Sequence, residues 1–239
     1  MDSKTPAGVR EIPGMIQINA EKQFPTDEVL RFQYTFETGK IAVICGRSGS
    51  GKTTLLRLLA GLETADSGSI TWPVSLREHR QATGIVFQQP VLVPHMNVRE
   101  NLAIGWRLHY NHLRKLWWAR TEPSELRQRL DEAIPLLELE PYLKRLPSAL
   151  SGGQQHRVAL GRCLIRRPAV FLLDEPLAHL DLALARRLRT RLVECFRRWQ
   201  STVIWVTHDL EEAHAVADQL IVLDSDCSVQ PDTPDSSKP

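Results

Sequence analysis

Four short apolar runs in the chain each lead into a glycine loop or a polar side chain. They cover residues 41–44, 85–87, 170–173 and 203–206. Continuous apolar runs of this length, separated by helix-like segments, are typical of strands that are buried on both faces of a parallel sheet. We therefore predict an α/β fold. Ligands of parallel sheets bind beyond the carboxyl ends of the strands, so we expect the four polar endings to meet at one edge.

The middle of the chain, about 91–150, has a helical pattern and no convincing central strand. After Ser124, apolar residues recur near a helical spacing at Leu126, Leu130, Ile134 and Leu137. Pro135 lies inside this stripe, so we expect a kink or a break there. The pattern predicts an all-helical insertion between strands of the sheet.

The two ends of the chain differ from the rest. Residues 1–13 and the Asp-, Ser- and Pro-rich residues 224–239 are predicted to be flexible. Between them we predict a single domain, residues 14–223. Its core consists of residues 14–90 and 151–223, and the helical insertion covers about 91–150.

Composition excludes several classes of protein. The 239 residues, 42% of them hydrophobic, are enough to bury a substantial core. A net charge of +2, from 30 basic and 28 acidic residues, gives no indication of a nucleic-acid partner. The four cysteines are widely spaced and form no C-x-x-C pair, so we expect reduced thiols. No apolar signal core or run of about 20 apolar residues is present, and we expect a soluble chain.

The run at 41–44 leads into a glycine-rich loop and then into a helix-like segment. The loop reads Gly46, Arg47, Ser48, Gly49, Ser50, Gly51, Lys52 and Thr53, with Thr54 next. Glycines let several backbone N–H groups point at one anion, and the helix N-terminus adds positive potential. This order indicates a triphosphate site, in which Lys52 reaches the β- and γ-phosphates and the Thr53 hydroxyl ligates Mg²⁺.

Two acids, Asp174 and Glu175, follow the run at 170–173. Neighbouring residues on an extended backbone point to opposite sides, so the two carboxylates can do different work. We expect Asp174 to hold Mg²⁺ through its shell and Glu175 to polarise the attacking water, because phosphoryl transfer needs mainly positioning and charge neutralisation.

A second glycine loop precedes another helix-like run. It contains Ser151, Gly152, Gly153 and Gln154, and Pro168 stops the run. This is a second anion-binding helix N-terminus, with Ser151 available as its cap. One nucleotide rarely needs two such sites.

The second loop, about twenty residues before the acid pair, resembles the signature of the ATP-binding cassette family, and the likeness covers about 16–223. The resemblance implies a P-loop NTPase sheet core with an inserted helical subdomain. It also implies that Gln88 is the Q-loop glutamine, at the catalytic centre and the metal, and that His208 contacts the γ-phosphate. Residues 178–181, ending at Asp181, match the D-loop. Phe24 stands where the family stacks an aromatic ring on adenine; a core or loop phenylalanine is the alternative.

In this family two cassettes pack head to tail, with each ATP between one phosphate loop and the other chain's signature. The resemblance therefore implies ATP and Mg²⁺ as cofactors and a second cassette as partner. It also implies that the signature of this chain closes on the γ-phosphate of the ATP that the second cassette holds. Two positions depart from the family pattern: Ala178-His179 replace Ser-Ala in the D-loop, and His156 replaces a common glutamine after the signature. We expect these replacements to modify the ATPase activity without abolishing it.

Segments 56–63, 67–70 and 94–102 look like the ATPase subunits of bacterial importers for thiamine, molybdate, sulfate, polyamines and sugars. The resemblance implies a peripheral subunit at the cytoplasmic face of the membrane, bound to permease subunits and served by an extracytoplasmic binding protein, without contact to the cargo. Many of these carry a C-terminal regulatory domain, and we expect this chain to lack one, as in the thiamine type. An exporter cassette and a non-transport soluble cassette are the alternatives.

Residues 106–120 are basic and aromatic. One interpretation is contact with a membrane partner or lipid headgroups through Trp117 and Trp118, and the other is a helical packing face with solvated arginines. We expect the helical insertion, with Gln88 at its edge, to receive a coupling helix of the membrane subunit.

Overall fold

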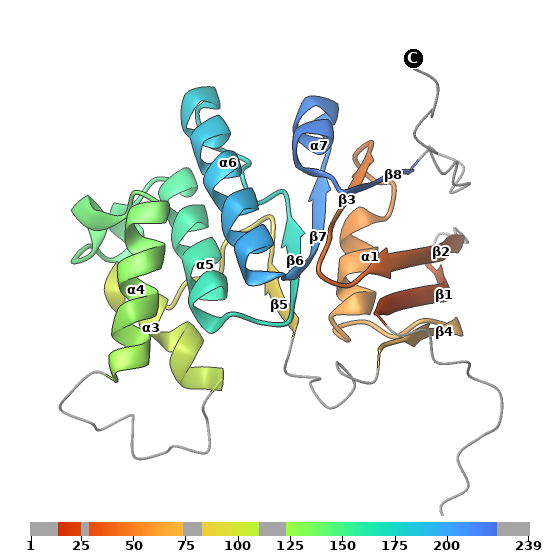
Figure 1. Cartoon of the computed structure of the whole chain (residues 1–239), viewed down its shortest axis with the longest axis horizontal. Helices are drawn as coiled ribbons and strands as arrows, with labels where there is room; N and C mark the ends of the chain where they lie inside the picture. Colours follow the sequence, from red (N-terminus) through yellow and green to blue (C-terminus); the bar gives the residue numbers. More distant parts are fainter. Residues whose placement is uncertain (1–13, 25–28, 74–82, 110–122, 224–239) are drawn as a thin grey trace, which may run out of the picture.

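A computed structural model of the chain describes residues 14–24, 29–73, 83–109 and 123–223, with side chains to 106 in the third range (Figure 1). The predicted flexible ends and the two tryptophans Trp117 and Trp118 lie outside the described residues.

The main sheet has five parallel strands in the order β5-β6-β7-β3-β8. The strands are β3 (Ile41–Gly46), β5 (Thr83–Val86), β6 (Val170–Asp174), β7 (Thr202–Thr207) and β8 (Gln219–Leu223). Every residue of β6 and β7 is buried, as expected for strands covered on both faces. The predicted α/β fold is therefore confirmed, with one parallel strand, β8, that the sequence analysis did not identify.

Successive residues of the central strands pack into two different cores. Val43, Phe171 and Trp205 belong to a cluster with the helices α5 (Gly152–Arg166) and α6 (Leu182–Trp199). Their neighbours Ile44 and Leu172 belong to a cluster with α1 (Lys52–Leu59) and a second sheet. Figure 1 shows the main sheet between these two layers, with α7 (Leu210–Val216) near the end of β3.

The second sheet is antiparallel and was not predicted. Its order is β2-β1-β4, with β1 (Met15–Gln23), β2 (Val29–Glu37) and β4 (Ser67–Thr71). Side chains of β2 alternate strictly between exposed and buried, and the buried ones pack toward α1. A Cβ at Gly51 would lie 2.5 Å from Leu30 of β2, so this sheet also supports the glycine loop.

Helices connect β5 to α5. They are α3 (Val98–His109), α4 (Ser124–Leu136) and the 3₁₀ turns η2 (Glu140–Tyr142) and η3 (Pro147–Ala149), and the described part of 91–150 contains no strand. Pro135 lies in the last turn of α4, which ends one residue later, so the predicted interruption takes the form of a helix end. In Figure 1, α3 and α4 lie beside α5, on the side away from the second sheet.

A buried asparagine fastens the start of α3. Asn101 is 0% exposed. Its side chain accepts a hydrogen bond from Val93 N at 2.8 Å and donates to the carbonyl oxygens of Val93, Met96 and Asn97 at 2.8–3.1 Å. The segment from 93 to 97 is therefore held by one side chain and not by regular secondary structure.

We predict that Asn101→Ala lowers the free energy of unfolding by about 2 kcal/mol, because it leaves buried backbone groups without partners. Urea denaturation followed by circular dichroism measures this change. Gln128→Ala, on the exposed face of α4, is the control and should change the free energy by less than about 0.5 kcal/mol. Equal stability of the two variants would contradict the proposed fastening.

Candidate nucleotide-binding site

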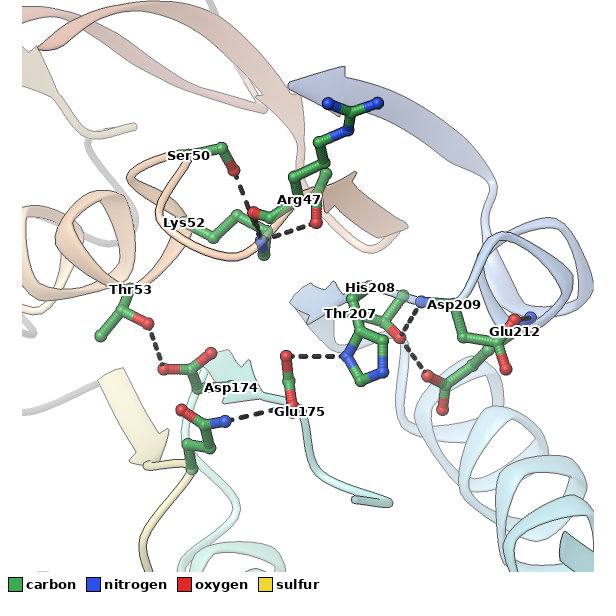
Figure 2. Close-up of polar contacts among 12 residues, drawn as sticks. Arg47, Ser50, Lys52, Thr53, Asp174, Glu175, Thr207, His208, Asp209 and Glu212 are labelled. Carbon is green, nitrogen blue, oxygen red and sulfur yellow. Dashed lines mark hydrogen bonds and ion pairs between the residues drawn. The ribbon is translucent and has the colours of Figure 1, made fainter. Parts of the chain in front are cut away.

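The loop between β3 and α1 is arranged around the ammonium group of Lys52. Gly49 and Gly51 both have φ of 85°, in the left-handed region that glycine adopts without strain. Lys52 Nζ donates to the carbonyl oxygens of Gly46 and Arg47, and it lies 3.4 Å from Ser50 Oγ (Figure 2). Burial lowers the pKa of Lys52, whereas Glu175 and Asp174 act to raise it.

Thr53, the second residue of α1, donates a hydrogen bond of 2.8 Å to Asp174 Oδ2 at the end of β6. Asp174 is 3% exposed. Burial raises the pKa of this carboxyl group, and the hydrogen bond from Thr53 opposes that shift. The two residues assigned to Mg²⁺ in the sequence thus lie in contact.

Glu175 lies at the centre of the polar contacts in Figure 2. Its carboxylate is 2.9 Å from His208 Nδ1 and accepts a hydrogen bond of 3.3 Å from Gln88 Nε2. Its backbone N–H donates to Val206 at the end of β7, and its φ is 46°. The expected meeting of strand endings at one edge is observed, because Gln88, Asp174, Glu175 and His208 follow three neighbouring strands.

A second layer of polar groups lies behind His208, and the sequence analysis missed it. Thr207 Oγ1 donates to Glu212 Oε2 at 2.5 Å and accepts from Asp209 N at 3.1 Å. Asp209 caps α7 by accepting from the N–H groups of Glu211 and Glu212. Burial raises the pKa of Glu212. An acid followed three residues later by glutamate is a capping pattern that could have revealed this layer.

A cavity of about 250 Å³ lies over the loop. Several predicted residues line it, namely Phe24, Ser48, Gly49, Gly51, Lys52, Thr53, Thr54, Gln88, Asp174 and Glu175. Leu30, which the sequence analysis did not name, lines it as well. Phe24 is thus brought to the glycine loop from the end of β1, although no motif fixed its position.

A larger cavity, of about 830 Å³, lies at the opposite ends of the strands among the turns that contain Gly39, Arg167 and Gln200. None of the predicted site residues lines it. Because parallel sheets bind ligands at the carboxyl ends of their strands, the smaller cavity is the candidate nucleotide site.

The signature residues form the capped start of α5. Ser151 Oγ accepts from Gln154 N at 3.3 Å, and Gln154 Oε1 accepts from Ser151 N at 3.0 Å, so the predicted cap is part of a capping box. Asp181 caps α6 through Leu184 N. Neither Asp181 nor Ser151–Gln154 lines the cavity over the loop.

The donor set at the loop fits Mg²⁺ bound together with phosphate. Thr53 Oγ1 and Asp174 Oδ2 are oxygen donors 2.8 Å apart, close to the separation of about 3 Å between adjacent ligands of an octahedral ion with bonds of about 2.1 Å. No three His, Cys, Asp or Glu side chains in the described part of the chain could hold a metal by themselves. Mg²⁺ usually takes one or two protein ligands, here Thr53 and Asp174, and completes its shell with phosphate and water.

The chain is similar in sequence to known proteins. The sequence model of the family described as ABC transporter matches residues 29–178. The chain belongs to the ABC transporter family. The sn-glycerol-3-phosphate import ATP-binding protein UgpC of Paracoccus denitrificans is 44% identical over 200 residues, 82% of this ABC chain and 54% of the relative. The maltose/maltodextrin import ATP-binding protein MalK of Vibrio cholerae is 40% identical over 193 residues, 79% and 49% of the two chains. The chain spans about half the length of these relatives.

Solved structures of ABC cassettes share the fold. The dimeric ATP-binding cassette MJ0796, in a post-hydrolysis state bound to ADP and Pi, has a TM-score of 0.74 and 28% identity, with 90% of this chain and 96% of that one covered. The cbiO1 protein of Clostridium perfringens, part of the ABC transporter complex cbiONQ, has a TM-score of 0.72 and 25% identity, with 92% and 88% covered. Among the described residues of this ABC chain, no helix is both long and apolar enough to cross a membrane.

His156, one of the two departures from the ABC pattern, is buried in α5. The residue is 1% exposed, and neither ring nitrogen has a hydrogen-bond partner within the described residues. Burial, with a smaller effect from the charge of His179, lowers the pKa of His156 to about 4. The ring is therefore neutral at physiological pH.

We predict that His156 makes the stability of the cassette sensitive to acid. Above pH 6.5 the ring is neutral in both states; as the pH falls toward 4, the unfolded chain takes up a proton that the folded chain does not, and stability is lost. At pH 5 the loss amounts to about 2 kcal/mol. Urea denaturation at pH 7.5 and pH 5 should show His156→Gln gaining this amount over the wild type on acidification. An identical pH dependence in both chains would contradict the prediction.

Proposed function

We propose that this chain is the ATP-hydrolysing subunit of a solute importer. The observation that carries the proposal is the contact of Glu175 with both Gln88 and His208, beside a glycine loop whose Thr53 reaches Asp174. Thr53, Gln88, Asp174 and Glu175 line one cavity with the loop and provide a general base and a metal site there. His208, beside Glu175, adds a phosphate contact. Both relatives are import ATP-binding proteins, which supports import over export and over a role outside transport.

In the proposed reaction Lys52 turns from the loop carbonyls to the β- and γ-phosphates, which the backbone N–H groups of the loop also bind. Phe24 at the cavity wall packs on the adenine. Thr53, Asp174 and Gln88 are the residues that hold Mg²⁺. When bound, the ion neutralises charge on the phosphate oxygens.

Glu175 orients a water molecule and accepts its proton while the water oxygen bonds to the γ-phosphorus and the bond to the β-phosphate oxygen breaks. The products are ADP and inorganic phosphate. His208, with a side chain that is 66% exposed beside the 16% exposed side chain of Glu175, contacts the γ-phosphate from the open side. The hydrogen bonds among Thr207, Asp209 and Glu212 keep the backbone that carries His208 in place.

We further propose that two copies of the chain complete each other's sites head to tail. Ser151–Gln154 and Asp181 do not line the cavity of their own chain, and the solved relative MJ0796 is dimeric. In this arrangement Ser151, Gly152 and Gly153 close on the γ-phosphate that the partner holds, and Asp181 faces the partner's nucleotide. Residues 14–90 and 151–223 serve as the core, and about 91–150 as a helical subdomain that receives the membrane subunit.

The remaining partners in the proposal are permease subunits and an extracytoplasmic binding protein that selects the solute. The cassette then lies peripherally at the cytoplasmic face of the membrane and takes no part in contacting the solute. The names of the two relatives assign sn-glycerol-3-phosphate and maltose or maltodextrin to those proteins.

Glu175→Gln tests the chemistry. The amide keeps the shape of the side chain but cannot accept a proton, so we expect turnover to fall by a factor of about 10²–10⁴ while Mg-ATP binding is retained. The variant should also remain dimeric with ATP in size-exclusion chromatography. Glu140→Gln, at an exposed carboxylate outside the site, is the control. Equal turnover of Glu175→Gln and the wild type would remove Glu175 from its role.

Purification of the chain from its native cells in mild detergent, with mass spectrometry of what co-purifies, tests the importer assignment. We expect a polytopic membrane protein together with an extracytoplasmic binding protein. A membrane partner without any binding protein would favour an exporter. Recovery of only ribosomal or soluble partners would overturn the transport role and leave the ATPase.

A further inference from the structure

The two departures from the family pattern meet in the structure. The rings of His156 on α5 and His179 in the loop after β6 have centroids 6.5 Å apart, with 44° between their planes. His156 is buried and His179 is exposed, so the inner ring lies beneath the outer one at the surface. Two positions that looked unrelated in the sequence thus form one contact between a helix and a loop.

The backbone of the loop rests on the same helix. A Cβ at Gly153 would lie 2.6 Å from the carbonyl oxygen of His179, closer than real contacts allow, so the loop lies directly on the second residue of α5. His179 therefore contacts α5 twice, through its carbonyl at Gly153 and through its ring at His156.

The loop also has an unfavourable backbone conformation at both ends of its turn. Glu175 and His179 have φ of 46° and 65°, in the left-handed region that residues with a Cβ seldom adopt. Such conformations persist where surrounding contacts hold them, and they occur often at functional sites. The carbonyl of Glu175 accepts from Ala178 N at 3.0 Å, which closes a tight turn that ends directly before His179.

The burial of His156 is not explained by a gain in the stability of the fold. Neither ring nitrogen has a hydrogen-bond partner among the residues that the structure describes, and a buried polar group without one destabilises the folded state. A residue kept at a cost to stability is typical of a functional position. In the loop, this ring contacts the ring of His179.

We propose that His156 is a positioning residue for Glu175 and acts through His179. By filling the space under the outer ring, it keeps the turn from 175 to 179 in one conformation, and the carboxylate of Glu175 stays within reach of both Gln88 and His208. The hydrogen bond to Gln88, at 3.3 Å, is already long, so a small tilt of the turn breaks it. This inference rests on the proposed hydrolysis of ATP.

Steady-state kinetics of the full-length chain test the inference with His156→Ala, His179→Ala and the double variant. We expect each single substitution to lower kcat about 5- to 10-fold and to leave the KM for ATP within about twofold, because the phosphate loop is untouched. The double variant should be no slower than the slower single variant, since both remove the same contact. Multiplied effects in the double variant would overturn the coupling, and an unchanged kcat in His156→Ala would overturn the inference.

Leu164→Ala is the matched control, because Leu164 is buried two turns further along α5 and its loss leaves a cavity away from the loop. Its kcat should stay within about twofold of the wild type at a temperature where all variants are folded. A fall in kcat as large as that of His156→Ala would assign the effect to general destabilisation and would overturn the inference.

Amide hydrogen exchange in a peptide covering residues 176–180 separates the inference from the proposed function. We expect exchange in His156→Ala to be at least about 10-fold faster than in the wild type, and exchange in Leu164→Ala to be unchanged there. If the wild-type chain hydrolyses no ATP, the proposed function fails while the exchange still reports on the contact. Unchanged exchange in His156→Ala would overturn the positioning role on its own.

Discussion

The parallel pairing of β6 between β5 and β7 is the constraint on which the site depends. In this register Val86 lies opposite Leu173, and Asp174 lies opposite Val206, so the three strands end at the same level. The residues that follow them come from positions far apart in the chain and yet emerge side by side. β3, paired with β7 on the other side, adds the glycine loop at the same edge. One hydrogen-bonding pattern thereby brings together the residues proposed as base, metal ligands and phosphate-binding loop.

The strands that could be predicted are those whose burial is visible without a partner. β6 and β7 are apolar at nearly every position, because helices and a second sheet cover both faces. β2 also carries a readable pattern, alternating at Leu30, Phe32, Tyr34 and Phe36, and could have been recognised. β4 has no buried residue and exists because β1 pairs with it, so its own sequence contains no signal for a strand.

The same limit applies to the candidate site. Lys52, Thr53, Asp174 and Glu175 lie in short motifs, where local spacing and chemistry are enough to name them. The polar groups behind His208 include the hydroxyl of Thr207 and the carboxylate of Glu212, which are in contact because α7 folds back against β7. The contact of His156 with His179 joins positions 23 apart in number, on a helix and in a loop, and only the folded chain brings them together.

The hydrogen bonds of Lys52 to its own loop have a consequence for affinity. The ammonium group joins the carbonyl oxygens of Gly46 and Arg47, so an internal cation helps to order the loop. In the proposed function a phosphate takes the ammonium group away from the carbonyl oxygens, so the binding free energy includes the difference between these two sets of acceptors. If the loop carbonyl oxygens were poorer acceptors, the ammonium group of Lys52 would be more available to phosphate. The loop itself would then be less ordered. The hydrogen bonds of Lys52 Nζ that order the loop therefore oppose the attraction of the same nitrogen atom for phosphate.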